Sequence, residues 1–376
     1  MNKSSRKAMR FVGLDVHADS IAVAIAEPGG EVRSIGTVPN REESVSRLVK
    51  RLNAGGSWEA CYEAGPTGYA LYWQLAKKGI VCTVVAPTLI PKKAGDRVKT
   101  DRRDAERLAR CFRAGDLTAV WVPDSAHEAL RDLVRAREAA KQDQLRARHR
   151  LGKFLLRQGR RPPEGMRSWT RTHLEWIKAK VQFEEKAQQW TLEDYINEVE
   201  HCGQRIERLE GLIDEAVQSA PETMREVIAA LQALRGIAAM TAVTIVAEVG
   251  ALSRFQTARQ LMGYSGAVAS EHSSGERNRR GHITKTGNAH LRRVITEAAW
   301  TQAHKPILSK RLKVRQEGLP PEVIEIASKA MHRLHKRYER LMARGKSKQQ
   351  TITAVAREML GFIWAIGVAI EHRNAA

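Results

Sequence analysis

Strand-like segments are confined to the first third of this chain, and this restricts its fold more than any other feature. Runs of alternating or continuous apolar residues predict strands at 10–16, 20–27, 31–38, 58–63 and 80–86. Helical patterns are found at 42–53, 68–78 and 101–114. Because the turn Pro28-Gly29-Gly30 joins two early runs, we expect an antiparallel three-strand meander followed by α/β units, within a mixed α/β domain over residues 1–124.

After residue 124 the strand signals vanish, and we expect helical arms over 125–220 and a mainly helical domain over 221–376. A coiled-coil-like seam, within the chain or between two copies, is predicted by apolar residues spaced by three, four or seven: Leu192, Ile196, Val199, Ile206, Leu209 and Ile213. Around Gly236 the pattern predicts a helix, a glycine turn and a second helix. Such a hairpin can offer N–H groups to a DNA phosphate, although any corner between helices needs such a glycine.

The charge balance indicates a polyanionic partner. The chain has 63 Lys and Arg against 42 Asp and Glu, a net charge of +21, and a pI of about 10.1. Its four cysteines form no C-x-x-C pair, so neither a zinc module nor a disulfide framework is indicated. The apolar run at 359–370 is shorter than the roughly 20 residues that span a bilayer, and no signal peptide is predicted. We therefore expect a soluble protein without membrane association.

The basic segment 141–171 holds ten Lys or Arg against two acids, a net charge of +8. One interpretation is a solvated helix face. The density of charge and the nearby Trp169 and Trp176 favour phosphate contacts and base stacking instead. The residues predicted to bind nucleic acid here are Arg146, Arg148, Arg150, Lys153, Arg157, Arg160 and Arg161.

Acidic residues of the first domain predict a metal site. Asp15 interrupts the apolar run 11–16, and Glu63 ends another strand-like run. Asp101 and Asp104 are three residues apart near a helix start, so their side chains share one face. Mg²⁺ prefers such oxygen ligands, with Mn²⁺ as the alternative ion. The competing interpretation is that Asp101 merely caps its helix among solvated charges.

Residues 263–288 interrupt the helical C-terminal region and are rich in glycine, serine and arginine. Glycines let a backbone approach a ligand closely, hydroxyls supply nucleophiles, and cations neutralise a phosphate. Those cations, which extend into the following segment, are Arg277, Arg279, Arg280, Lys285, Arg292 and Arg293. Thr286-Gly287-Asn288 predicts the start of the next helix. The competing interpretation is a disordered surface loop.

Four motifs in register resemble the IS110 family of transposases, close to its IS1111 branch, over nearly the whole chain. They are Gly13-Leu14-Asp15-Val16, Glu63 with Ala64-Gly65-Pro66-Thr67-Gly68, Lys99-Thr100-Asp101-Arg102-Arg103-Asp104-Ala105, and Ser270-Glu271-His272-Ser273-Ser274-Gly275 before Ile283-Thr284-Lys285-Thr286-Gly287-Asn288. The chain departs from the family in one place. Gly65-Pro66 follows Glu63 where an Ala-Thr-Gly run is usual.

The resemblance implies a ribonuclease-H-type, RuvC-like N-terminal domain whose Asp-Glu-Asp-Asp set holds Mg²⁺; here the set is Asp15, Glu63, Asp101 and Asp104. It implies coiled-coil arms and a transposase domain with a nucleophilic serine. That serine maps to Ser274, because the family's serine directly precedes a glycine, with Ser273 as the alternative. It also implies a structured non-coding bridge RNA that pairs with donor and target DNA. A dimer or tetramer in the cytoplasm, associated with the nucleoid, is expected.

We therefore expect a DNA transposase or recombinase that cleaves and rejoins strands through the serine, with insertion, excision and inversion all open. One rival is a metal-dependent RuvC-like junction nuclease, in which activated water cuts DNA and the serine segment only binds it. The other is a basic nucleic-acid-binding scaffold without catalytic activity.

Overall fold

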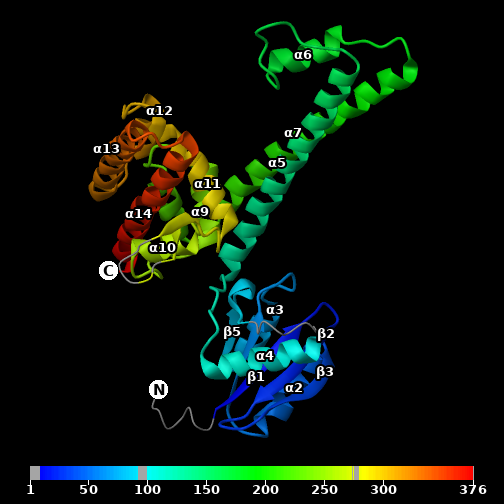
Figure 1. Ribbon diagram of the computed structural model, residues 1–376, viewed down its shortest axis with the longest axis vertical. Coiled ribbons are helices and arrows are strands. Elements are labelled where there is room, and N and C mark those ends of the chain that lie inside the picture. Colours follow the sequence, from blue (N-terminus) through cyan, green and yellow to red (C-terminus); the bar gives the residue numbers. More distant parts are fainter. Residues whose placement is uncertain (1–8, 92–99, 273, 275–278, 376) are drawn as a thin grey trace. The chain divides into compact units, whose positions relative to one another are not determined.

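The computed structural model describes residues 9–91, 100–272, 274 and 279–375, which divide into two compact units, Met1–Val122 and Pro123–Ala376. The first unit contains a five-stranded sheet in the order β3-β2-β1-β4-β5 (Figure 1). Its strands are β1 (Arg10–Val16), β2 (Ser20–Ala26), β3 (Val32–Pro39), β4 (Trp58–Glu63) and β5 (Cys82–Val85). The first three pair antiparallel, and β4 and β5 add in parallel. This confirms the predicted meander and the mixed α/β class.

Helices cover both faces of this sheet. They are α2 (Glu42–Asn53), α3 (Ala70–Lys77), the short η1 (Pro87–Leu89) and α4 (Asp101–Ala114). On β1, Val12 and Leu14 belong to the core that α2 and α3 share. Gly13 points the other way, where a Cβ atom would lie only 2.3 Å from the carbonyl oxygen of Ala105 in α4. The backbones of β1 and α4 are therefore in direct contact at Gly13. This contact fixes the start of α4 close to the end of β1.

The second unit begins with two long helices that run side by side, α5 (Ser125–Arg157) and α7 (Lys186–Gln218), with α6 (Arg171–Lys180) near their distal ends (Figure 1). The six predicted seam residues of α7 are all buried. Because α7 packs against α5 of the same chain, these residues are covered within the chain. The coiled-coil geometry itself stays a prediction.

Of the remaining helices, all but the two short ones at Trp300–Ala303 and Lys310–Gln316 contribute residues to one large apolar core. The remaining helices are α8 (Glu222–Leu231), α9 (Ala239–Val249), α10 (Ala258–Tyr264), α11 (Ala289–Ala299), η2 (Trp300–Ala303), α12 (Lys310–Gln316), α13 (Pro321–Ala343) and α14 (Lys348–Ala375). Leu130 and Val134 of α5 belong to the same core. The base of the arm is thus continuous with the C-terminal helices, and a domain boundary near residue 220 stays a prediction.

The last helix, α14, is longer than the apolar run noted in the sequence. By length and composition it could cross a membrane, but one such helix is weak evidence. Ile352, Val355 and Met359 are buried in the core, where α8, α10, α11 and α13 pack against α14. These contacts account for its apolar character as a core helix.

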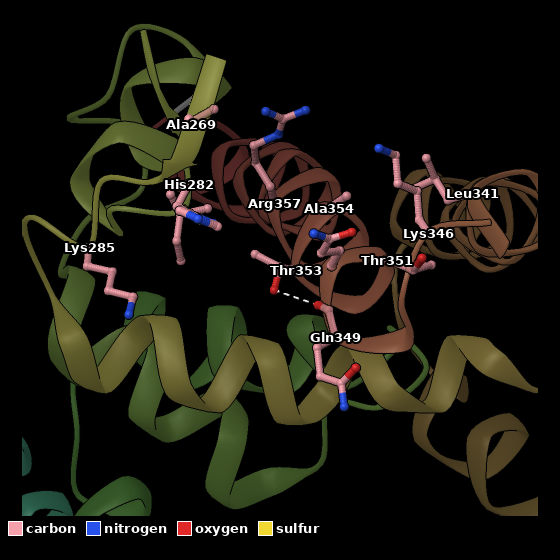
Figure 2. Close-up of a pocket in the computed structure, with 14 residues that line it drawn as sticks. Ala269, His282, Lys285, Leu341, Lys346, Gln349, Thr351, Thr353, Ala354 and Arg357 are labelled. Carbon is pink, nitrogen blue, oxygen red and sulfur yellow. Dashed lines mark hydrogen bonds between the residues drawn. The ribbon is translucent and has the colours of Figure 1, made fainter. Parts of the chain in front are cut away.

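The serine-containing segment is not a plain loop. It contains a short antiparallel pair of strands, β6 (Ala269–Glu271) and β7 (Arg280–Ile283), which the sequence analysis missed. The hairpin borders a pocket of about 670 Å³ together with the loop before α14 and the first turns of that helix (Figure 2).

Candidate functional site

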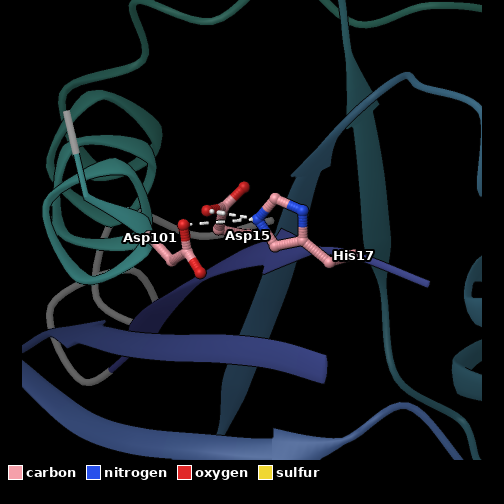
Figure 3. A group of neighbouring side chains, drawn as sticks. All are labelled: Asp15, His17 and Asp101. Atoms are coloured by element: carbon pink, nitrogen blue, oxygen red, sulfur yellow. Dashed lines mark hydrogen bonds and ion pairs between the residues drawn. The ribbon is translucent and has the colours of Figure 1, made fainter. Parts of the chain in front are cut away.

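Three ligand-offering side chains gather where β1 ends, beside the start of α4 (Figure 3). The Nε2 atom of His17 lies 3.3 Å from Oδ2 of Asp15 and 3.5 Å from Oδ1 of Asp101. One ligand atom from each residue lies within 4.8 Å of the other two. Two carboxylates and an imidazole at this spacing can share one divalent cation, so these residues fit a metal site.

The electrostatics of Asp15 point the same way. Burial raises the pKa of Asp15 above its ordinary value, the negative charges of Asp104 and Asp101 raise it further, and His17 opposes the change. His17 therefore does not fully offset the cost of burying the negative charge of Asp15 beside two other acids. A bound cation would relieve this repulsion.

The other two predicted ligands, Glu63 and Asp104, lie outside this group of three. β1 and β4 pair in parallel with Leu14 opposite Tyr62, both in the core on the α2 and α3 side. The next residues, Asp15 and Glu63, are therefore neighbours on the α4 side at the carboxyl ends of their strands. Asp104 is buried, and its carboxylate pairs with Arg107. The four-acid ligand set thus stays a proposal, and of its members only Asp15 and Asp101 belong to the described group of three.

Asp101 is not the cap of its helix. The N-cap of α4 is Thr100, whose side chain accepts a hydrogen bond from the N–H of Arg103 at 3.3 Å. Because Thr100 fills the capping role, the Asp101 carboxylate is free for other partners. The N-cap interpretation of Asp101 is wrong for this reason.

His17 is absent from the set predicted from sequence. Residues i and i+2 of an extended chain point to the same side, so the order Asp15-Val16-His17 places acid and imidazole together. That D-x-H spacing after a strand is the signal that identifies His17.

The base of the serine hairpin is fixed by two close backbone crossings. A Cβ atom on Gly266 would lie 1.8 Å from the carbonyl oxygen of Thr286, and one on Gly287 would lie 2.1 Å from that of Tyr264. Both glycines have positive φ angles, 67° and 84°. Only glycine permits such contacts, so the two ends of the segment are held together.

Ser274 lies between β6 and β7 and is exposed. The alternative nucleophile Ser273, together with Gly275 and Arg277, lies outside the described residues. The exposed hydroxyl of Ser274 is accessible to a DNA phosphate, which a nucleophile requires. Which of the two serines reacts stays a prediction.

A buried carboxylate links the hairpin base to the arm. Glu248 is fully buried at the end of α9, and its two oxygens accept hydrogen bonds from Nε and Nη2 of Arg135 in α5, at 2.8 and 2.9 Å. It also accepts one from Nδ2 of Asn288 at 2.7 Å. Burial raises the pKa of Glu248, but the hydrogen bonds from Arg135 and Asn288 outweigh it and leave the pKa below its ordinary value. The carboxylate is therefore charged at neutral pH.

Asn288, which binds Glu248, also begins the next helix. Its Oδ1 accepts the N–H of Leu291 at 2.9 Å, so it is the N-cap of α11. The prediction that Thr286-Gly287-Asn288 opens a helix is confirmed. The sequence analysis missed Glu248, although it is the one charged residue in the apolar helix 239–249.

Two of the predicted phosphate-binding cations near the hairpin have structural partners. Arg292 donates from Nη1 to the backbone oxygen of Ser265 at 2.8 Å. Arg293 pairs with Glu138 at 2.8 Å and with Glu297 at 3.0 Å. Arg279 and Lys285 are exposed, while the side chains of Arg277 and Arg280 lie outside the described residues. Lys285 and Arg279 are thus the described cations of this set best placed to meet a phosphate.

Several of the predicted cations of the basic arm also have partners within the protein. Arg146 pairs with Asp143, Arg148 lies 5.6 Å from the Trp169 ring centre, and Arg160 lies 5.2 Å from that of Phe183. Arg150 lies 3.9 Å from Glu198 and Arg157 lies 5.8 Å from the ring centre of Phe154, but both are exposed, as are Lys153 and Arg161. This surface suits a nucleic-acid backbone.

The two predicted stacking tryptophans are partly buried. Trp169 and Trp176 pack against the small apolar core near the distal end of the arm. Trp190 of α7, which the sequence analysis did not single out, is 65% exposed. Of these three rings, Trp190 offers the most surface to a base.

Comparisons with known proteins connect both units to one family. A family model described as "Transposase IS116/IS110/IS902 family" matches residues 228–313, and the DEDD transposase model of the IS110 family matches residues 12–158. The chain is 46% identical to the putative transposase y4qE of Sinorhizobium fredii, over 95% of this chain and 88% of that protein. It is 32% identical to the transposase for insertion sequence element IS1533 of Leptospira borgpetersenii, over 89% and 97%. Its identity to the transposase for insertion sequence element IS1111A of Coxiella burnetii is 33%, over 23% and 25%.

Proposed function

The chain belongs to the IS110 family of transposases and is a DNA transposase or recombinase, and we propose that it cleaves and rejoins DNA through Ser274 with the help of its acidic site. The observation that carries the proposal is the convergence of Asp15, His17 and Asp101 at the start of α4. The exposed serine in the glycine-framed hairpin supports it.

In the proposed step, Oγ of Ser274 attacks a DNA phosphorus. The Oγ–P bond forms as the bond between phosphorus and the leaving strand oxygen breaks. The serine proton passes to a general base, and the leaving oxygen takes up a proton. Because one phosphoester replaces another, the bond energy is kept and the reverse attack rejoins a strand without ATP.

The ion that we propose for the acidic site is Mg²⁺, with Mn²⁺ as a substitute. Asp15 and Asp101 would hold it, with Glu63 and Asp104 completing the set. A divalent ion there supplies Lewis-acid stabilisation of phosphate charge. His17 holds both nearest carboxylates in place through its Nε2 atom. On this account the first unit is a RuvC-like nuclease domain.

The partners follow from charge and family. We propose that the basic arm holds a structured guide RNA and that donor and target DNA occupy the remaining basic surface. A dimer or tetramer in the cytoplasm, at the nucleoid, is part of this proposal. The net charge of +21 supports a protein that works on polyanions.

The experiment is adduct formation on a labelled DNA substrate with the guide RNA present. Wild type is expected to give a covalent protein–DNA adduct that withstands denaturation, and Ser274→Ala to give none. Ser273→Ala is the matched control and retains the adduct. Cleavage by Ser274→Ala at the wild-type rate would establish the metal-only nuclease. Nucleic-acid binding by wild type without any cleavage or adduct would establish the scaffold.

A further inference from the structure

The pocket beside the serine hairpin has the composition of a nucleotide site (Figure 2). One wall is β7 with Ile283, and the opposite wall is α14 with Ala354 and Arg357. Its volume of about 670 Å³ lies within the range of roughly 300–1,000 Å³ that is typical of small-ligand pockets. Apolar walls with a few polar groups between them suit a flat base.

Cations line this pocket without counter-charges. Lys285, Lys346 and Arg357 all border it, and none of the three forms an ion pair with a described residue. No Asp or Glu is among the described lining residues. Three positive charges around one pocket, with no acid among its described lining residues, favour an anionic ligand.

Lys285 is held at the pocket by its backbone. Its φ is 55°, in the left-handed region that side-chain-bearing residues rarely adopt. Its N–H donates to the carbonyl oxygen of Gly266 at 3.1 Å, within the glycine crossing that closes the hairpin. The cation is therefore anchored to the base of the segment that carries Ser274.

Thr351 adds an independent sign of a ligand. It lines the pocket from the first turns of α14 and is only 1% exposed. Its hydroxyl oxygen has no hydrogen-bond partner among the described residues. A buried hydroxyl without a partner is costly, so a shift of this side chain that brought its hydroxyl to a ligand in the pocket would be favourable. The amides of Gln349 and Gln350 lie on the same turns.

We propose that this pocket binds one unpaired nucleotide of the DNA strand that the serine hairpin handles. The phosphate is neutralised by Lys285, Lys346 and Arg357, and the base lies against Ile283 and Ala354. A paired base must first be unpaired and unstacked, at a cost of a few kcal/mol, so an unpaired nucleotide is the favoured occupant. DNA is favoured over RNA because the pocket wall β7 belongs to the hairpin of Ser274. This inference rests on the proposed function.

The amides give the pocket a means to discriminate bases. Glutamine can donate and accept towards one base edge, most favourably adenine. The side chain of Gln349 is exposed, and its backbone carbonyl oxygen accepts a hydrogen bond from the Thr353 hydroxyl at 2.8 Å (Figure 2). Gln350 is exposed on the first turn of α14. The pocket therefore selects a base as well as holding a phosphate.

The test is equilibrium binding of a short, labelled single-stranded DNA to the full chain, measured by fluorescence anisotropy at several salt concentrations. Arg357→Ala is expected to weaken binding about tenfold and to reduce the salt slope by roughly 0.7, the value for one single-strand phosphate contact. Arg373→Ala, the same change near the other end of α14, is the matched control and is expected to change binding less than about twofold. Thermal melts of both variants confirm that they fold.

Two further measurements complete the design. Gln350→Ala is expected to flatten the ranking of oligo-dA, oligo-dC and oligo-dT while leaving the salt slope unchanged. Equal losses for Arg357→Ala and Arg373→Ala would overturn the pocket, and so would dependence on Arg357 for RNA but not for DNA. Because uncleaved DNA is the probe, Ser274→Ala is expected to bind normally. Adduct formation by Ser274→Ala would overturn the serine mechanism, but the binding assay would still test the pocket.

Discussion

The acidic site and the serine hairpin are built by opposite means. Asp15 and Asp101 lie on a central strand and on a helix that packs against it at backbone distance. Ser274 is exposed between two short strands, and the base of its hairpin is fixed by close crossings. A metal site needs ligands that already converge, and the first unit brings its ligand atoms together. A residue that meets a substrate needs an exposed side chain, and Ser274 is exposed.

Close backbone contacts at glycines hold both sites in place, and we expect the largest effects from adding a side chain to these glycines. Gly13→Ala would press a Cβ atom against Ala105, and Gly266→Ala would press one against Thr286. We expect each to lower the free energy of unfolding by about 3 kcal/mol or more, because backbone atoms cannot move aside cheaply. Urea unfolding of the full chain measures both.

Gly263→Ala is the matched control for these variants. Gly263 lies in α10, and nothing described would come within 4 Å of an added Cβ atom. We expect a gain of about 0.5–1 kcal/mol from helix propensity. If Gly13→Ala or Gly266→Ala unfolded at the wild-type urea concentration, the close crossings described above would be wrong.

The next prediction changes a buried charge near the hairpin base and leaves the acidic site of the first unit untouched. Glu248→Gln removes the buried charge that Arg135 and Asn288 share, and we expect a loss of about 2 kcal/mol, reduced from the usual cost because Arg135 is 45% exposed. Adduct formation should fall with it, since the hairpin base loosens. Metal binding by the first unit should not change. Glu297→Gln, which removes a surface partner of Arg293, is expected to cost less than about 0.5 kcal/mol.

The smallest effect concerns Asp15 and pH. Because its pKa is raised in the folded chain, the folded state binds this proton more tightly than the unfolded state. The metal-free protein therefore gains stability from this group as pH falls through the raised pKa towards 3.8, while affinity for Mg²⁺ falls over the same interval. Thermal melts at tenfold the Kd should show about 1.4 kcal/mol of stabilisation by Mg²⁺ near neutral pH.

Asp15→Asn is the control for that measurement. It removes the charge that burial and the neighbouring acids disfavour, so the metal-free variant should melt no lower than wild type. Mg²⁺ should not stabilise it. An equal Mg²⁺ effect in both proteins would place the ion elsewhere.

The sequence predicted what depends on local patterns. The five strands were found because their apolar runs differ sharply from the helical segments, and the Asn288 cap because capping chemistry is local. The strands β6 and β7 were missed, since three or four residues give no measurable alternation. Glu248 was missed because its partner Arg135 is 113 positions away, and His17 because the search followed acids alone.

The acids of the candidate site could be predicted from the sequence, but their partners could not. Asp15 and Asp101 are distant in sequence, and only the packing of α4 on β1 brings them to one imidazole. The pairing of Asp104 with Arg107 could not be foreseen, because Arg107 is one of many arginines on that helix. The pocket at α14 also depends on long-range packing, which joins residues near 283 to those near 354.

The central claim of the proposal is that the covalent step at Ser274 requires the acidic residues. The most direct measurement is adduct yield by Asp15→Asn and Asp101→Asn, each with Ser274 intact and with RNA binding assayed in parallel. We predict that both variants bind RNA like wild type and form no serine–DNA adduct. Adduct at the wild-type level in either variant would contradict this requirement and leave the serine acting without the acids.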